Sequence, residues 1–194
     1  MRSFFEIRWI LSIPFICCIL LFLSCKIASL PATTAKVDTL IQVSAQPPRT
    51  IGGFYIVINK SEYTLTLFRD TTVVKVYPCA VGKNKGDKLR RWDYCTPEGN
   101  FYVESIEKSS SWAHDFRGDG KGLIRGAYGP WFFRLHTGSE TTNTGLSWTG
   151  YAIHGTHDPS SIGKNASEGC IRLKNEDILD IKQFIQVGIP VRIE

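Results

Sequence analysis

This chain of 194 residues has little excess of charge of either sign. It contains 23 Lys and Arg and 18 Asp and Glu, which gives a formal net charge of only +5 at pH 7. No stripe of basic residues interleaved with aromatics is present, and its absence argues against a nucleic-acid-binding surface. No internal repeat is visible, so the chain is not a repeat array. The mild positive charge suits a solvated surface or contact with an anionic wall or membrane.

A long apolar run is also missing. Arg2 and Arg8 precede an uncharged segment from Trp9 to Ser24, but its 16 residues are fewer than the about 20 that a spanning helix needs, and Pro14 interrupts it. A basic start, a short apolar stretch and a small residue at its end are typical of an export signal. An uncleaved N-terminal anchor is the alternative, and both place the rest of the chain outside the cytoplasm.

The apolar run ends at a cysteine. Cys25 follows Ser24 directly, which resembles a lipoprotein processing site, although Phe22 and Leu23 are bulkier than the usual pattern. We therefore expect residues 1–25 to be an export signal, either ordinary or of the lipoprotein type. The protein is then periplasmic or in the cell envelope, and a lipid on Cys25 would make the bacterial membrane a partner.

Only three further cysteines follow: Cys79, Cys95 and Cys170. In an oxidising compartment an odd number leaves at least one thiol free. Cys79 ends one strand-like run and Cys95 precedes a turn, so the two can either be bridged or remain free thiols. The sequence leaves both outcomes open.

Two parts follow the signal. Residues 26–50 are expected to be a tether, because they carry Pro31, Pro47 and Pro48 and no long periodic pattern. Residues 51–194 have a common domain size.

The first two thirds of this domain have the period of β-strands. In residues 63–68 (YTLTLF), Thr alternates with Leu and Tyr, as in a strand with one buried face. Further strands are expected at residues 54–59, 71–77, 100–106, 131–136, 151–154 and 188–193.

One helix is expected near the C-terminus. Asn175 is its expected cap and Gly188 its exit. Its apolar side is expected to comprise Ile178, Leu179, Ile181, Phe184 and Ile185. The fold class is therefore mainly β, a sandwich or sheet with a C-terminal helix packed on it.

The chemistry is expected in residues 151–173. A strand-like segment ends in His154, and a loop of 15 residues leads to Cys170. Thiol catalysis needs a basic nitrogen near the Cys, because the thiolate is the nucleophile and free Cys has a pKa of about 8.5. The loop can bring His154 and Cys170 together. The N–H groups of Gly169 and Cys170 are candidate donors to an oxyanion.

Several elements in this order resemble the L,D-transpeptidase catalytic domain, the YkuD-like family. Residues 154–156 (HGT), 159–163 (PSSIG) and 167–173 (SEGCIRL) resemble its signature. Residues 96–101 (TPEGNF) resemble its upstream TPxGxF element. The resemblance covers roughly residues 52–194, and it implies a mainly β fold.

The resemblance also implies a reaction. The family cleaves a peptidoglycan stem between the L-centre of a diamino acid and D-alanine, through a Cys thioester, and an amine of another stem takes the acyl group. Carried over, Cys170 is the nucleophile and His154 the proton acceptor and donor. A backbone carbonyl around Gly155 or Thr156 would orient the His154 ring. Peptidoglycan stem peptides are the implied partners, and no cofactor is implied.

Three further residues are expected to bind substrate or shape the site. Ser167 would shape it, and Arg172 is a candidate clamp for a substrate carboxylate, with a structural ion pair as the alternative. Glu168 departs from the family, many of whose members have His there. A carboxylate beside a thiolate raises the thiol pKa unless it is paired or turned away, and it is also suited to meet an acceptor ammonium.

Other polar residues are expected to be less specific. A zinc site at His154, His157, Asp158 and Cys170 is disfavoured, because the two histidines lie on a loop and no second Cys is nearby, so no metal is expected. His114 and His136 are expected at the surface or the cleft rim. The basic loop at Lys83, Lys85, Lys88, Arg90 and Arg91 is expected to be solvated, with binding of stem carboxylates or glycan as the alternative.

Three functions remain at this point. The first is an L,D-transpeptidase that makes or remodels peptidoglycan cross-links. The second is an L,D-carboxypeptidase, in which water takes the acyl group. The third is a non-catalytic wall-binding module, which predicts a damaged Cys/His pair, whereas Cys170 and His154 are both present.

Overall fold

The computed structural model describes residues 52–116, 120 and 122–194. The predictions for the export signal, the tether and Cys25 lie outside these residues. Within them, no helix is long and apolar enough to cross a membrane.

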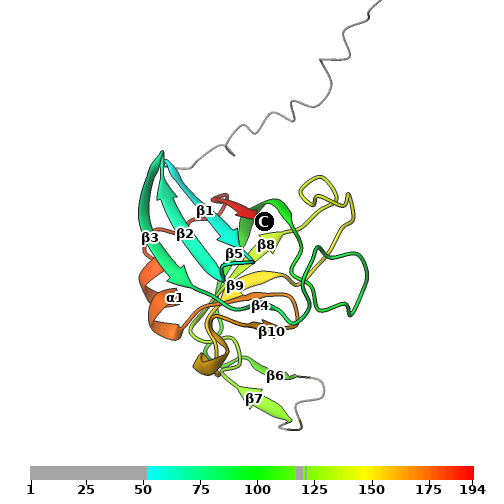
Figure 1. Cartoon of the computed structure of the whole chain (residues 1–194). Coiled ribbons are helices and arrows are strands. Elements are labelled where there is room, and N and C mark those ends of the chain that lie inside the picture. The colour runs from blue at the N-terminus through cyan, green and yellow to red at the C-terminus, as the bar shows by residue number, and fades with distance from the viewer. Residues whose placement is uncertain (1–51, 117–119, 121) are drawn as a thin grey trace, which may run out of the picture. The chain divides into compact units, whose positions relative to one another are not determined.

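The domain is built on a curled sheet of eight strands in the order β11-β9-β8-β5-β12-β1-β2-β3 (Figure 1). Their bounds are β1 Phe54–Asn59, β2 Thr64–Arg69, β3 Thr72–Pro78, β5 Gly99–Lys108, β8 Trp131–His136, β9 Ala152–His154, β11 Ile171–Arg172 and β12 Pro190–Ile193. Two small sheets complete the β-structure: β4 (Val81–Gly82) with β10 (Asn165–Ser167), and β6 (Ala113–Asp115) with β7 (Leu123–Arg125). The described helices are η1 (Pro159–Ser161) and α1 (Asn175–Ile181).

The alternation seen in the sequence produces the core. Leu65 and Leu67 of β2 are fully buried, while Thr64 and Thr66, which alternate with them, are only partly covered. Ile178 and Ile181 of α1 belong to the same buried cluster. Burying apolar surface is the main favourable contribution to folding, so this shared cluster holds helix and sheet together. The prediction of a mainly β domain with one packed C-terminal helix is confirmed.

The predicted helix was wrong in its cap and its length. α1 ends at Ile181, and Lys174 rather than Asn175 precedes its first turn without a side-chain cap. Asn175 Oδ1 instead accepts a hydrogen bond of 2.9 Å from the Thr156 N–H. Leu179 is 55% exposed and so is not on the apolar side.

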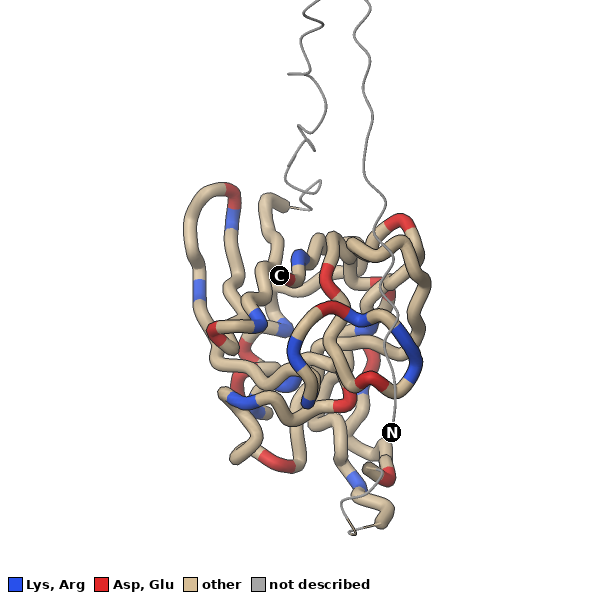
Figure 2. Tube along the Cα trace, turned by 45° about the vertical axis from the view of Figure 1, so that its right-hand side comes forward, with Lys and Arg blue, Asp and Glu red and all other residues tan. Residues whose placement is uncertain are grey.

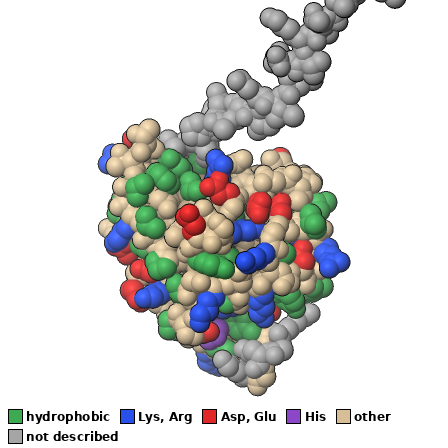
Figure 3. Space-filling view, viewed as in Figure 1, with side chains coloured by type: hydrophobic (Ala, Val, Ile, Leu, Met, Phe, Trp, Pro, Cys, Tyr) green, Lys and Arg blue, Asp and Glu red, His purple; other side chains and the backbone are tan. Residues whose placement is uncertain are grey.

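Charged and apolar side chains are distributed differently over the surface. Basic and acidic residues are interspersed along the trace, as the small net charge implies (Figure 2). Apolar side chains gather over the edge strand β3 (Figure 3), where Val73, Val74 and Val76 are exposed.

The far edge of the sheet positions the chemistry. β9 and β11 run parallel, with His154 opposite Arg172. A parallel pair requires a crossover connection, and the crossover here is the loop between His154 and Cys170. The loop therefore returns the chain to β9 with Cys170 directly before Ile171, the residue that pairs with Ile153 of β9.

Candidate active site

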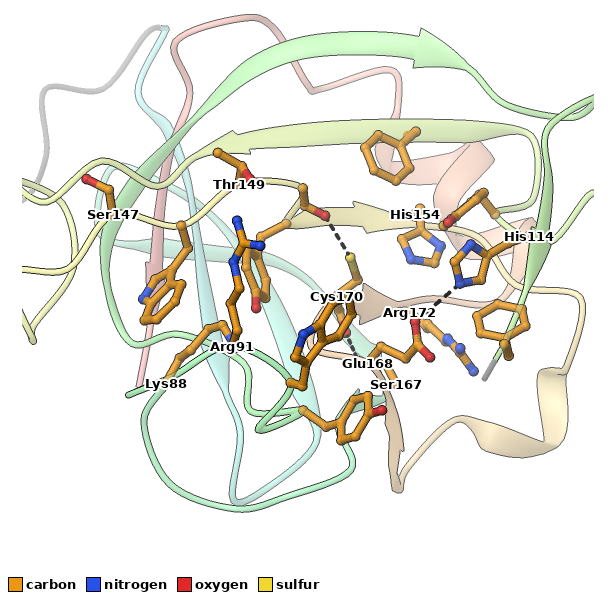
Figure 4. Close-up of a pocket in the computed structure, with 18 residues that line it drawn as sticks. Lys88, Arg91, His114, Ser147, Thr149, His154, Ser167, Glu168, Cys170 and Arg172 are labelled. Carbon is orange, nitrogen blue, oxygen red and sulfur yellow. Dashed lines mark hydrogen bonds and ion pairs between the residues drawn. The ribbon is translucent and has the colours of Figure 1, made fainter. Parts of the chain in front are cut away.

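A pocket of about 560 Å³ opens at this edge of the sheet (Figure 4). Cys170 and His154 both line it, together with Ser167, Glu168 and Arg172. The loop brings together five of the residues predicted from the sequence. The other three, Gly155, Thr156 and Gly169, support the backbone around them.

A network of short hydrogen bonds fixes the turn before Cys170. Ser167 Oγ donates to the Cys170 carbonyl (2.5 Å) and accepts from the Gly169 N–H (3.0 Å). Thr96 Oγ1 donates to the Gly169 carbonyl (2.8 Å). Gly169 has φ 129°, and a Cβ there would lie 2.6 Å from the Tyr151 ring, so the turn requires glycine. The Gly169 N–H, expected as an oxyanion donor, is already paired.

The Cys170 thiol is partly exposed to the pocket. Its Sγ donates to the Gly150 carbonyl at 3.4 Å rather than to the His154 ring. Burial raises the pKa of this thiol to about 11, and the negative charge of Glu168 contributes in the same direction. A hydrogen bond from the Ala152 backbone and the charge of Arg172 oppose the rise. At neutral pH the resting group is therefore a thiol.

His154 has a fixed tautomer. Its ring is 1% exposed, and its Nδ1 lies 2.5 Å from the Gly155 carbonyl oxygen. Because a carbonyl only accepts, Nδ1 is the donor and the neutral ring carries its lone pair on Nε2. Burial lowers the pKa of His154 to about 3, and the positive charge of Arg172 adds to the effect. The ring stacks on Phe132 at 5.5 Å between centroids and is a neutral base at rest.

Arg172 is buried in the pocket wall, with 6% of its surface exposed. Its guanidinium lies 4.8 Å from the centre of the Phe116 ring, and its Nε has no hydrogen-bond partner. Among the described residues no carboxylate forms an ion pair with it, so the alternative of a structural ion pair is not observed. Burial lowers its pKa, but a guanidinium stays charged at any ordinary pH.

Glu168 has one paired and one unpaired oxygen. Its Oε2 lies 3.2 Å from His114 Nε2, and its Oε1 is buried without a partner. His114 comes from β6, 54 residues away in the chain. The sequence placed His114 at the surface or the rim and offered no signal for this pairing.

Thr156 supports the loop. It is buried, its N–H donates to Asn175, and its Oγ1 accepts from the Asp158 N–H at 3.0 Å. Gly155 packs against Gly129 and Asn175 so closely that any Cβ would collide with them. These two residues hold the carbonyl that orients His154.

One wall of the pocket was not foreseen. Lys88 is 4% exposed and forms an ion pair of 2.6 Å with Asp93, so the expectation of a solvated basic loop was wrong for this residue. Its Nζ lies 4.8 Å from the Trp148 ring centre, and Arg91 and Trp92 complete the wall. The sequence signal for this ion pair was the presence of Asp93 five residues after Lys88.

The remaining thiols lie elsewhere. Cys79 and Cys95 are buried and free, so the open question of a bridge between them is answered by two separate thiols in this structure. No three His, Cys, Asp or Glu side chains of the described segments cluster as metal ligands would.

The chain is similar to known proteins over this whole domain. The family described as YkuD, L,D-transpeptidase catalytic domain, matches residues 53–193. The putative L,D-transpeptidase YkuD of Bacillus subtilis is 29% identical over 85% of this chain and 80% of its own length. The corresponding protein of Bacillus licheniformis is 30% identical over 80% of this chain and 74% of its own length.

Solved structures share the fold. An L,D-transpeptidase from Mycobacterium smegmatis has a TM-score of 0.52 at 20% identity, over 73% of this chain and 58% of its own. The L,D-transpeptidase LdtMt1 in complex with imipenem has a TM-score of 0.51 at 22% identity, over 73% and 59%. The chain thus spans less than two thirds of either structure. By its matched residues and its fold, the chain belongs to the L,D-transpeptidase catalytic domain family.

Proposed function

We propose that this protein is a cysteine-dependent L,D-transpeptidase that forms or remodels peptidoglycan cross-links through a thioester on Cys170. One observation carries the proposal: Cys170 and His154 line one pocket, and the Gly155 carbonyl leaves the His154 lone pair on Nε2. A thiol and an adjacent base of fixed tautomer are the parts that nucleophilic catalysis requires.

Acylation begins from a neutral pair. His154 Nε2 takes the thiol proton as Cys170 Sγ attacks the carbonyl of the diamino acid, so thiolate forms only when substrate is present. The carbon–nitrogen bond to D-alanine then breaks, and the leaving amine takes the proton from His154. The products of this half-reaction are the thioester and free D-alanine.

Developing charge needs partners in the pocket. The Cys170 N–H is the remaining candidate donor to the oxyanion, since the Gly169 N–H is paired with Ser167. The buried guanidinium of Arg172 has an unpaired Nε and matches the geometry of a substrate carboxylate. Its positive charge also stabilises the Cys170 thiolate as that forms.

The products of one substrate distinguish transfer from hydrolysis. Purified protein given disaccharide-tetrapeptide is expected to yield dimers that have lost one D-alanine, because an amine held in near-attack geometry outcompetes water. Tripeptide alone would identify an L,D-carboxypeptidase instead. No product and no imipenem adduct would contradict enzymatic function and favour a wall-binding module.

We also propose that the protein is exported, with the tether of residues 26–50 letting the domain reach the wall. A lipid on Cys25 would add membrane anchoring, since multiple acyl chains hold a protein firmly where one does not. Cys25→Ala is expected to release the protein from the membrane fraction and to remove incorporation of labelled lipid. Unchanged fractionation and no label on the unmutated chain would contradict the lipid.

A further inference from the structure

Glu168 is unfavourable for the first half of the proposed reaction. Its negative charge raises the pKa of the Cys170 thiol and therefore opposes formation of the thiolate that acylation requires. The conflict disappears once the thioester has formed, because the sulfur then carries no charge. A role for Glu168 is consequently expected in the second half-reaction.

The two oxygens of Glu168 have different surroundings. Oε2 meets His114, whose ring packs edge-on against Phe116 at 4.5 Å and against Tyr128 at 5.6 Å between centroids. These contacts hold the carboxylate in one orientation. Oε1 is buried with no donor, and an unsatisfied buried carboxylate oxygen is costly, so the resting carboxylate is incompletely paired. The side chain as a whole is 25% exposed and lines the pocket, where a donor can reach the carboxylate.

Charged side chains lie on both sides of Cys170 in the pocket. Glu168 and His114 lie on one side of Cys170, and Lys88 and Arg91 lie on the other (Figure 4). Arg172 is beside Glu168 but makes no ion pair with it. The carboxylate of Glu168 therefore offers a negative charge to a cation that enters. On the opposite side Arg91 carries a positive charge, whereas the charge of Lys88 is paired with Asp93.

We infer that Glu168, oriented by His114, binds the ammonium group of the acyl acceptor and so selects a cationic amine over water. The inference rests on the proposed thioester and deepens it, because it names the residue that determines the acceptor. Glu168 contacts the incoming substrate, and His114 is a positioning residue.

The proton balance of this step is complete. The acceptor arrives as R–NH₃⁺ with one N–H donating to the Glu168 carboxylate. His154 Nε2 takes one proton, and the amine nitrogen forms a bond to the thioester carbon. The carbon–sulfur bond then breaks, and His154 returns its proton to Cys170 Sγ. A second proton leaves the nitrogen for solvent, so the thioester and the ammonium become an amide, a thiol and one released proton.

Competition between acceptors tests the inference on the full chain. Disaccharide-tetrapeptide serves as donor and as cationic acceptor, and hydroxylamine is added as an acceptor that is uncharged at neutral pH. Mass spectrometry then weighs dimer, hydroxamate and tripeptide from one reaction. Glu168→Gln keeps the shape but removes the charge, and it is expected to lower the dimer-to-hydroxamate ratio about tenfold, the size of one charge-assisted hydrogen bond.

The same variant is expected to change acylation in the opposite direction. Without the carboxylate, the Cys170 thiol ionises more readily, so imipenem should acylate Glu168→Gln faster than the unmutated protein. Glu140→Gln is the matched control, because Glu140 also pairs with a histidine, His136 at 2.6 Å, but lies outside the pocket. This control is expected to leave both readouts unchanged.

Each outcome discriminates. An unchanged dimer-to-hydroxamate ratio in Glu168→Gln, with acylation intact, overturns the assignment of Glu168 and leaves the thioester standing. Equal losses of dimer, hydroxamate and acylation indicate a structural role and also overturn it. Failure of the unmutated protein to acylate overturns the proposed function and this inference together.

Discussion

Cys79 and Cys170 are both free thiols with raised pKa values, yet their surroundings differ. Cys79 lies in the core, and burial alone raises the pKa of its thiol to about 12. Cys170 is partly exposed, and its pKa of about 11 results from burial opposed by the Ala152 backbone and Arg172. The resting pKa values barely separate the two residues.

The two thiols differ in the neighbouring groups that can stabilise each thiolate when the proton leaves. Beside Cys170 the pocket supplies a neutral base, a buried guanidinium and room for substrate. No such groups lower the pKa of Cys79. On the proposed mechanism, the reactivity of Cys170 therefore depends on neighbours that stabilise the thiolate during the reaction rather than on a thiolate present beforehand.

Removing each thiol in turn gives the largest expected difference. Cys170→Ala is expected to abolish dimer and tripeptide formation, a loss of at least about 10³-fold, because no other nucleophile occupies the position. Cys79→Ala leaves a small cavity and is expected to reduce the free energy of unfolding by about 1–2 kcal/mol while activity per folded molecule is retained. Product mass and urea unfolding measure the two effects. Comparable activity losses in both variants would remove the distinction.

The base is the second difference between the two thiols. His154→Ala is expected to slow acylation by about 10²–10⁴-fold, the usual contribution of a positioned general base. His157→Ala, which alters a partly buried histidine of the same loop, is the control and should have a much smaller effect. Stopped-flow acylation with imipenem measures both. Equal rates for the two variants would contradict the assignment of the base.

Alkylation compares the thiols in one unmutated sample. In the native full chain, iodoacetamide is expected to modify Cys170 and to leave Cys79 and Cys95 unmodified, as peptide mapping would show. The Cys170 rate should rise about tenfold per pH unit below its pKa of about 11, because only the thiolate reacts. After unfolding without reductant, all three should react. A Cys79–Cys95 bridge, or equal native reactivity of Cys79, would contradict this description.

The smallest expected effect concerns the third thiol, Cys95. The backbone N–H of Cys95 donates a hydrogen bond of 3.1 Å to the Asp93 carboxylate, which also pairs with Lys88 in the pocket wall. Burial raises the pKa of Asp93, but the hydrogen bonds from Lys88 and three backbone N–H groups outweigh burial and lower this pKa to about 2. Asp93→Asn is expected to cost about 1–2 kcal/mol of stability at pH 7.

The pH dependence of that loss has a definite sign. A depressed carboxylate pKa stabilises the folded protein above the unfolded value of about 4, and this contribution is lost as pH falls toward 2. The stability difference between the unmutated protein and Asp93→Asn should therefore shrink over that window. A difference that stays constant from pH 7 to pH 2 would exclude the Asp93 charge as its cause.

The parts predictable from sequence were those set by local pattern. Alternation in residues 63–68 predicted a strand with one buried face because side chains on a strand alternate between its faces. The proximity of His154 and Cys170 could be predicted because a basic residue and a thiol stand at the two ends of one 15-residue loop. In each case the information lay within one segment of chain.

Contacts between distant segments could not be predicted. The sequence predicts Asn175 as a helix cap, but its side chain binds Thr156, 19 residues away. Glu168 binds His114, 54 residues away, and Lys88 is buried against Trp148. Each depends on how the strands pair, and no local pattern contains that information.

The most direct test of the proposed mechanism is to identify the covalent intermediate. The unmutated protein is incubated with disaccharide-tetrapeptide, quenched in acid and mapped by mass spectrometry. The proposed mechanism predicts a tripeptide acyl group on the Cys170 peptide, with release of one D-alanine and removal of the adduct by hydroxylamine. An acyl group on another residue, or continued product formation by Cys170→Ala, would contradict it.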